Sequence, residues 1–178
     1  EKKVIYRYPV NNYDEKELAD IIYRYGEEKF SRRIAANIVK SREKKPIETT
    51  FELVDIIKAS MPQRAMRDSH PARKTFQAIR IEVNAELDVL KSTLEDAFEI
   101  LAPGGRIAVI TFHSLEDRIV KEQFSKWGQG CTCPKEFPVC VCGNKPKGKS
   151  FKSISPSKEE LDENPRARSS RLRIFEKF

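Results

Sequence analysis

The stretch RIAVITFHSLEDRIVK (residues 106–121) decides the fold, because it has the pattern of a strand that leads directly into a helix. Its first part, residues 106–112, has the apolar and β-branched composition of a buried strand. Gly104 and Gly105 stand just before it and provide the turn that ends a preceding helix. A strand joined to a helix in this way predicts an α/β protein.

His113 and Ser114 lie where this strand gives way to the helix. Ser114 suits an N-cap position, and Asp117, three residues later, is placed to reach back as in a capping box. Open α/β sheets bind ligands at the carboxyl ends of their strands, so we expect an active site formed by His113, Ser114, Glu116 and Asp117. In the structural alternative, Ser114 and Asp117 only cap the helix, and His113 hydrogen-bonds in a turn. Ser114 lacks the Gly-x-Ser-x-Gly setting of a hydrolase nucleophile, which argues against serine hydrolysis.

The size and hydropathy of the chain favour a soluble protein. Its 178 residues suffice for one domain, or for two small ones that share a core. No apolar run approaches the roughly 20 residues of a membrane span, and the opening EKKVIYRYPV lacks the apolar region of a signal peptide. We therefore expect a cytoplasmic protein with no membrane partner.

The positive charge is concentrated in the last third of the chain. Residues 118–178 hold 14 Lys and Arg against 7 Asp and Glu, whereas the rest of the chain holds 20 of each. Such a basic surface suits an anionic partner such as nucleic acid, because counterion release drives binding to phosphates. The alternative is a solvated tail that only improves solubility.

The first half of the chain predicts a small helical module. Asp14 with Glu17, and Thr49 with Glu52, form two capping boxes, each followed by apolar residues at helical spacing. Between them a second helix is expected at about residues 27–42. Three short amphipathic helices in sequence are typical of an all-α module.

The remaining segments are less regular. Residues 63–70 are polar and predict a loop, and a helical pattern then extends to about Leu101, either as one helix or as two broken near Asn84. Residues 128–160 collect Gly, Pro and Lys and predict a partly mobile surface loop. The final SSRLRIFEKF has strand character.

All four cysteines lie in the predicted loop. Cys131, Cys133, Cys140 and Cys142 form two C-x-C pairs separated by six residues. Four soft ligands in a short loop could hold a tetrahedral zinc ion, although C-x-C is less usual than C-x₂-C. Free thiols and reversible disulfides are the alternatives.

Two basic groups are candidates for contact with RNA. Arg166, Arg168 and Arg171 precede the last strand, and guanidinium groups pair with phosphates and stack on bases. His70, Arg73 and Lys74 stand at the start of the long helical pattern. A charged edge strand and ordinary exposed side chains are the respective structural alternatives.

Four blocks in order resemble the bacterial RsmH family, also called MraW. They are YGEEKFSRRIA (residues 25–35), HPARKTFQAIRIEVN (residues 70–84), LAPGGRIAVITFHSLEDRIVK (residues 101–121) and ENPRARSSRLRIFEK (residues 163–177). Members of that family are S-adenosylmethionine-dependent methyltransferases that modify N4 of a decoding-centre cytidine in 16S ribosomal RNA. The resemblance implies 16S rRNA in the small ribosomal subunit as partner, and a role for His113 in contacting the target base or assisting its proton loss.

The resemblance also implies the architecture, an α/β fold with a partial Rossmann-like class I methyltransferase sheet and an all-α inserted domain. Residues 1–10 would form an atypical N-terminal segment, residues 11–84 the helical insertion and residues 85–178 the C-terminal part of the methyltransferase domain. The glycine-rich loop with which the family holds S-adenosylmethionine does not occur in this sequence, so the resemblance assigns no cofactor-binding residue.

Two functions follow from this reading. The chain can be part of an rRNA methyltransferase and inactive alone, as a fragment or with the missing half supplied elsewhere. Alternatively it is a degenerate relative, a non-catalytic RNA- or ribosome-binding module. A nucleic-acid-binding zinc ribbon would account only for the cysteines.

Overall fold

The computed structural model describes residues 7–66, 70–134 and 139–178. The chain divides into two compact units, residues 1–86 and 87–178, which we call the helical unit and the sheet unit. Most of the expected N-terminal segment, residues 67–69 of the expected polar loop and residues 135–138 of the expected cysteine loop lie outside the described residues. Among those described, no helix combines the length and the apolar character needed to cross a bilayer.

The helical unit contains the amphipathic helices that the sequence predicts. Its elements are α2 (Arg7–Asn12), α3 (Glu15–Gly26), α4 (Ser31–Arg42), α5 (Thr50–Ser60), a 3₁₀ turn (Gln63–Met66) and α6 (Arg73–Asn84). Both expected capping boxes are confirmed. Asp14 accepts the Glu17 N–H at 2.7 Å, and Glu17 accepts the Asp14 N–H at 2.9 Å. Local sequence therefore fixes where α3 and α5 begin.

Helix α4 begins later than the predicted residue 27. Glu27 adopts a left-handed conformation with φ 49° and ends α3. The carboxylate of Glu28 then accepts the N–H of Phe30 at 3.0 Å, which holds a turn before the helix starts at Ser31. A backbone reversal at Glu27 thus replaces the first turn of the expected helix.

The core of the helical unit forms from one apolar face of each helix. Leu18, Ile22, Ile34, Ile38 and Ile57 are among its fully buried side chains. At the end of α3 the backbone lies directly against α6, because a Cβ added to Gly26 would stand 2.7 Å from the carbonyl oxygen of Lys74. Glycine is needed at this position by the close approach of the two helices.

The helical pattern after residue 71 forms two helices, as one of the two alternatives predicted. Helix α6 ends at Asn84, and α7 (Glu86–Ile100) follows after Ala85, whose φ of 48° is left-handed. One residue in this conformation is enough to break the helical hydrogen-bond ladder.

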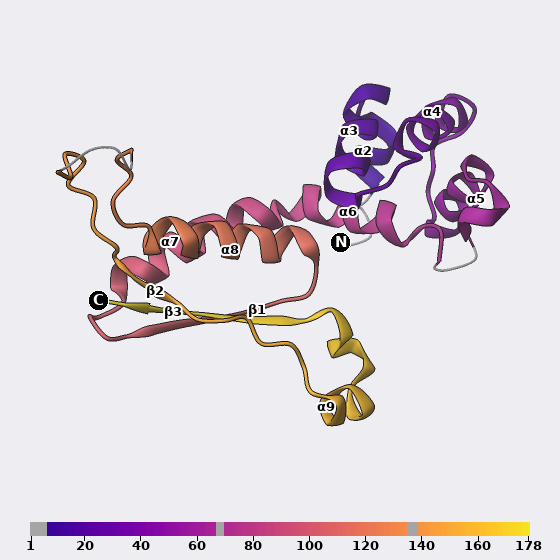
Figure 1. The fold of residues 1–178 in the computed structure, drawn as a ribbon. Coiled ribbons are helices and arrows are strands. Elements are labelled where there is room, and N and C mark those ends of the chain that lie inside the picture. The colour runs from indigo at the N-terminus through magenta and orange to yellow at the C-terminus, as the bar shows by residue number, and fades with distance from the viewer. Residues whose placement is uncertain (1–6, 67–69, 135–138) are drawn as a thin grey trace. The chain divides into compact units, whose positions relative to one another are not determined.

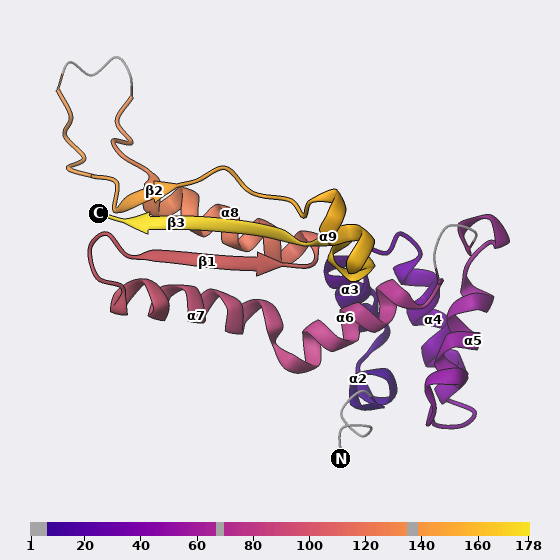
Figure 2. The ribbon, with the colours of Figure 1, turned by 90° about the horizontal axis from the view of Figure 1, so that it is seen from below.

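The sheet unit adds three strands to α7. Its elements are β1 (Arg106–Thr111), α8 (Ser114–Gly128), β2 (Gly148–Ser150), α9 (Lys158–Glu163), a 3₁₀ turn (Pro165–Ser169) and β3 (Arg171–Lys177). The strands are antiparallel in the order β1-β3-β2, with β3 in the middle (Figure 2). Thr111 is opposite Arg171, and Arg106 pairs with Glu176 at 2.7 Å. Both expected strands are present, and β2 with the start of α9 adds structure within the expected loop.

The described helices of the sheet unit cover one face of this sheet. Helices α7 and α8 lie on the same side (Figure 1) and pack Leu94, Val120, Phe124 and Trp127 against Phe175 of β3. On the other face Ile110 is 60% exposed, and Phe112 just beyond β1 is 56% exposed. The prediction of a fully buried strand at residues 106–112 is therefore wrong, since β1 ends at Thr111 and only Thr111 is buried.

Lys177 ties three parts of the sheet unit together. Its backbone N–H donates to the carbonyl oxygen of Gly105 at 3.0 Å, and its own carbonyl accepts the N–H of Gly104 at 2.8 Å. Its ammonium group donates to the carbonyl oxygens of Phe98 and Leu101 at 2.9 and 2.7 Å. The last turn of α7, the glycine turn and β3 are thus joined through one residue. Gly104 has a φ of 78°, as expected for the glycine turn.

Candidate functional site

A cleft of about 650 Å³ lies in the sheet unit at the N-terminal end of α8. One wall comes from the start of α8, and the other from the segment that leads into β3. The lining residues are His113, Ser114, Asp117, Arg118, Lys121, Ser155, Pro156, Arg168, Ser169, Ser170, Arg171 and Arg173. The structure therefore brings together the expected active-site stretch and part of the expected basic motif.

The cleft is strongly basic. Arg118, Lys121, Arg168, Arg171 and Arg173 line it, whereas Asp117 is the carboxylate among its lining residues. Guanidinium groups make bidentate hydrogen bonds to phosphate, and clustered cations attract an anionic polymer. The arrangement suits a ligand with several phosphates.

His113, not Ser114, caps α8. The Nδ1 atom of His113 accepts the N–H of Glu116 at 3.4 Å. In return Glu116 accepts the N–H of His113 at 3.2 Å and that of Phe112 at 2.8 Å. The capping box thus begins one residue earlier than predicted, and Ser114 is the first residue of the helix.

This capping box determines which nitrogen of the neutral His113 ring carries the proton. Because Nδ1 accepts a hydrogen bond, the neutral imidazole carries its proton on Nε2. That nitrogen is buried and lies 3.2 Å from Oε1 of Glu116, yet among the described residues no acceptor is aligned for a hydrogen bond with it. An unsatisfied buried donor is uncommon and is a feature of functional positions.

Glu116 supports the site from outside the cleft. Burial raises the pKa of its carboxyl, but the close His113 side chain and the hydrogen bond from the Phe112 N–H outweigh this and lower the pKa to about 2. Glu116 is therefore ionised at neutral pH, and it does not line the cleft.

Asp117 holds an arginine in the cleft wall instead of reaching back along the helix. Its two carboxylate oxygens accept hydrogen bonds from Arg173 at 2.7 and 2.9 Å. This pair, 14% and 22% exposed for Arg173 and Asp117, lowers the pKa of the Asp117 carboxyl. A carboxylate held in this way positions a guanidinium and is a poor proton acceptor.

Sequence reasoning missed Arg118, Lys121 and Arg173. The two helical cations continue a polar stripe with Ser114 and Asp117 at spacings of three, four and seven residues, which marks one face of a helix. Arg173 carries no such local signal, because its partner Asp117 lies 56 positions away in sequence.

The other basic candidates are not among the lining residues of this cleft. Arg166 is exposed but does not line the cleft. His70, Arg73 and Lys74 are exposed at the start of α6 in the helical unit. There His70 Nδ1 accepts the Ala72 N–H at 3.3 Å, and Lys74 donates to the Glu27 carbonyl at 3.0 Å.

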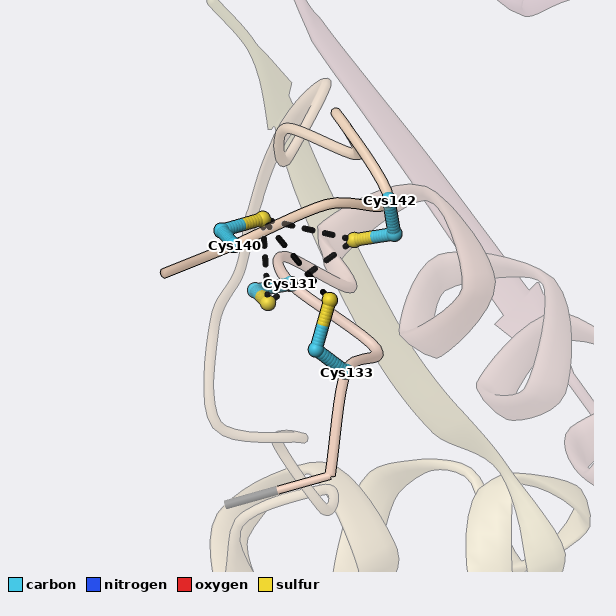
Figure 3. A group of neighbouring side chains, drawn as sticks. All are labelled: Cys131, Cys133, Cys140 and Cys142. Atoms are coloured by element: carbon cyan, nitrogen blue, oxygen red, sulfur yellow. Dashed lines mark hydrogen bonds between the residues drawn. The ribbon is translucent and has the colours of Figure 1, made fainter. Parts of the chain in front are cut away.

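The four cysteines converge in the loop between α8 and β2 (Figure 3). Their Sγ atoms all lie within 4.8 Å of one another, and all four thiols are free. Backbone N–H groups of Thr132 and Asn144 stabilise the thiolate of Cys142 and lower its pKa to about 5. The loop therefore brings together the residues that the C-x-C spacing singles out.

The family model and the curated relatives point to the same protein family. A family model described as the MraW methylase family matches residues 6–178. The chain is 57% identical over 172 residues to the ribosomal RNA small subunit methyltransferase H of Brevibacillus brevis, covering 95% of this chain and 55% of that protein. Identity is 56% over 171 residues to methyltransferase H 2 of Agathobacter rectalis, covering 94% and 54%. For the Ruminiclostridium cellulolyticum protein it is 54% over 172 residues, covering 95% and 55%. The chain thus spans about half the length of these curated relatives.

Proposed function

The chain belongs to the MraW methylase family, and from this premise we propose that it forms the RNA-facing part of a small-subunit rRNA methyltransferase. Its target is N4 of a decoding-centre cytidine in 16S rRNA. The observation that carries the proposal is the basic cleft, which joins His113 to five cationic side chains. RNA phosphates are the anions that such a cleft attracts in the cytoplasm, where we place the protein.

His113 orients the target base within this cleft. The exocyclic amine of cytosine is a weak nucleophile because its lone pair is delocalised into the ring, so the enzyme must position it and let it lose a proton. Nδ1 of His113 accepts the Glu116 N–H and Nε2 lies 3.2 Å from Oε1 of Glu116, so Glu116 holds the ring in place in the cleft wall, where the ring contacts the base. Ser114 and the Arg173–Asp117 pair shape the wall beside it.

The methyl donor is held outside this chain. S-adenosylmethionine supplies the methyl group when bound, but the described residues contain no glycine-rich loop between a strand and a helix. Gly104 and Gly105 precede β1 and are tied to Lys177, and β1 leads directly into the His113 cap. The residues present therefore do not fit the cofactor, and the chain alone is inactive.

The exposed side of the sheet supports a larger Rossmann-like sheet. The outer edge of β1 has no partner strand among the described residues, and Ile110 and Phe112 are exposed beside it. An open edge with apolar neighbours is a template for strand pairing. We place further strands and the cofactor site of the whole methyltransferase along this edge.

RNA binding tests the cleft directly. Fluorescence anisotropy with a decoding-centre rRNA fragment should show weaker binding by Arg168→Ala/Arg171→Ala, with a salt slope lower by roughly 0.7–0.9 per lost phosphate contact. The control Arg32→Ala/Arg33→Ala removes equal charge from the exposed face of α4 and should bind much like the parent chain. Equal losses in both variants would contradict a specific role for the cleft.

Reconstitution separates the enzyme from a non-catalytic binding module. Fusion to the part of the Brevibacillus brevis relative that this chain lacks should restore S-adenosylmethionine binding by calorimetry and methylation of cytidine N4. His113→Ala in that fusion should abolish methylation while cofactor binding persists. A fusion that binds RNA and cofactor but transfers no methyl group would favour the binding module.

A further inference from the structure

The cysteine loop has no part in the proposed reaction. It begins three residues after the end of α8, whereas His113 caps the start of that helix. A helix of 15 residues is roughly 22 Å long, so the cysteines and the basic cleft lie at opposite ends of α8. The loop needs an explanation of its own.

The sulfur atoms have the spacing of a tetrahedral metal site. Cys140 lies 3.3 Å from Cys131, 4.0 Å from Cys133 and 3.5 Å from Cys142, measured between Sγ atoms. Cys131 and Cys142 are 3.7 Å apart. Four thiolates about 2.3 Å from a central zinc stand roughly 3.8 Å from one another. The observed separations bracket this value and are far longer than a disulfide bond of about 2.05 Å.

The two C-x-C pairs support each other in matching ways. The N–H of Thr132, in the middle of the first pair, donates to Sγ of Cys142 at 3.4 Å. The N–H of Val141, in the middle of the second pair, donates to Sγ of Cys133 at 3.3 Å. Each pair thus offers an amide to a sulfur of the other, and such donors stabilise thiolates.

The ends of the loop are also closed independently of the cysteines. The side-chain amide of Asn144 donates to the carbonyls of Gln129 and Gly130 at 3.2 and 2.7 Å. The N–H of Lys147 donates to the carbonyl of Trp127 at 2.8 Å. The backbone is therefore arranged to hold the four sulfurs around one point.

We propose that Cys131, Cys133, Cys140 and Cys142 bind one zinc ion in a closed, structural site. Four sulfur ligands in a tetrahedron select zinc or iron among the common metals. The sulfurs are too close together to surround a multi-iron cluster, and zinc needs no redox partner. With four protein ligands the ion has no open position for substrate, so its role is to fix the loop between α8 and β2.

Metal analysis of the full chain, purified without chelator, tests the site. We expect one zinc per chain and four thiols that become reactive only after chelation. Cobalt added to the chelated protein should give the intense visible bands of a tetrahedral thiolate site, which do not depend on methyl transfer. Cys140→Ser/Cys142→Ser should lose both zinc and these bands, whereas Thr132→Ala, which keeps its backbone N–H, should retain them.

Three outcomes would overturn the proposal. They are four reactive thiols with less than one zinc per chain and no cobalt bands, disulfides detected by mass spectrometry of the native protein, and zinc retained by the double serine variant. Iron in place of zinc would overturn the choice of metal. Circular dichroism of the double variant checks that the rest of the chain is folded, and the cobalt spectrum of the parent chain stands even if that variant is not.

Discussion

The helical unit and the sheet unit differ in how completely each covers its apolar surface. Among the large apolar side chains that the described residues leave exposed, Tyr8, Tyr23 and Phe51 belong to the helical unit, and nine belong to the sheet unit. The helical unit buries one face of each helix around its own core, whereas the sheet unit leaves one face of its sheet uncovered. The difference agrees with our proposal that further strands of the methyltransferase sheet join the sheet unit.

The largest expected change in the free energy of unfolding comes from comparing variants on the two faces of the sheet. Phe175 is fully buried against α8, so Phe175→Ala should lower the free energy of unfolding by about 3–5 kcal/mol. Ile110→Ala, on the uncovered face, should cost less than about 0.5 kcal/mol. Urea denaturation measures both. A large cost for Ile110→Ala in the chain alone would show that this face is already covered. In the fusion to the Brevibacillus brevis segment the same variant should become costly.

A smaller loss of stability is expected from a change where α3 contacts α6 in the helical unit. Gly26→Ala places a methyl group against the Lys74 carbonyl, and overpacking of this kind costs about 1–3 kcal/mol. Gly130→Ala is the matched control, because its added methyl group meets only Pro146 at 3.6 Å, an ordinary contact. Similar melting temperatures for the two variants would contradict the close packing of α3 on α6.

Breaking the Asp117–Arg173 pair should lower the free energy of unfolding less than a change in either core does, but more than breaking a surface ion pair does. Asp117→Asn leaves a half-buried guanidinium without its charged partner, and we expect a loss of roughly 1.5 kcal/mol. Asp88→Asn, which breaks the exposed pair with Lys91, should cost less than about 0.5 kcal/mol. Equal unfolding midpoints for these variants would mean that the buried pair adds no stability.

The smallest effect is the pH-dependent contribution of the α8 cap. The pKa of Glu116 is lowered from 4.5 to about 2 in the folded chain, so the carboxylate stabilises the fold fully above its unfolded pKa and loses this contribution as pH falls toward 2. Glu116→Gln should cost about 1 kcal/mol at neutral pH, as for a lost cap. The difference from the parent chain should narrow steadily in urea titrations below pH 4.5, and a constant difference would contradict the assignment.

Local signals in the sequence predicted the starts of α3 and α5 well. Each capping box involves residues three positions apart, so its hydrogen bonds do not depend on the rest of the fold. At α8 two boxes compete, His113 with Glu116 and Ser114 with Asp117. Serine is the better cap by residue preference. However, Arg173 of β3 binds the Asp117 side chain, and only the folded structure reveals that contact.

The site was predictable in its residues but not in its arrangement. The sequence indicated Arg168 and Arg171 as RNA contacts and His113 as the active-site candidate, yet no local pattern places them in one cleft. Likewise the apolar composition of residues 106–111 suits a strand buried on both faces, whereas in this chain one face of β1 lies in solvent. Burial depends on which partners are present, and composition alone does not report them.

The four hydrogen bonds of Lys177 have a consequence for local motion. Its backbone and ammonium groups fasten the glycine turn and the end of α7 to β3. Amide protons in these three places should therefore exchange with deuterium as one cooperative block, slower than those of the exposed cysteine loop. The side chain and backbone of Lys177 would then couple the local unfolding of segments that are more than seventy positions apart in sequence.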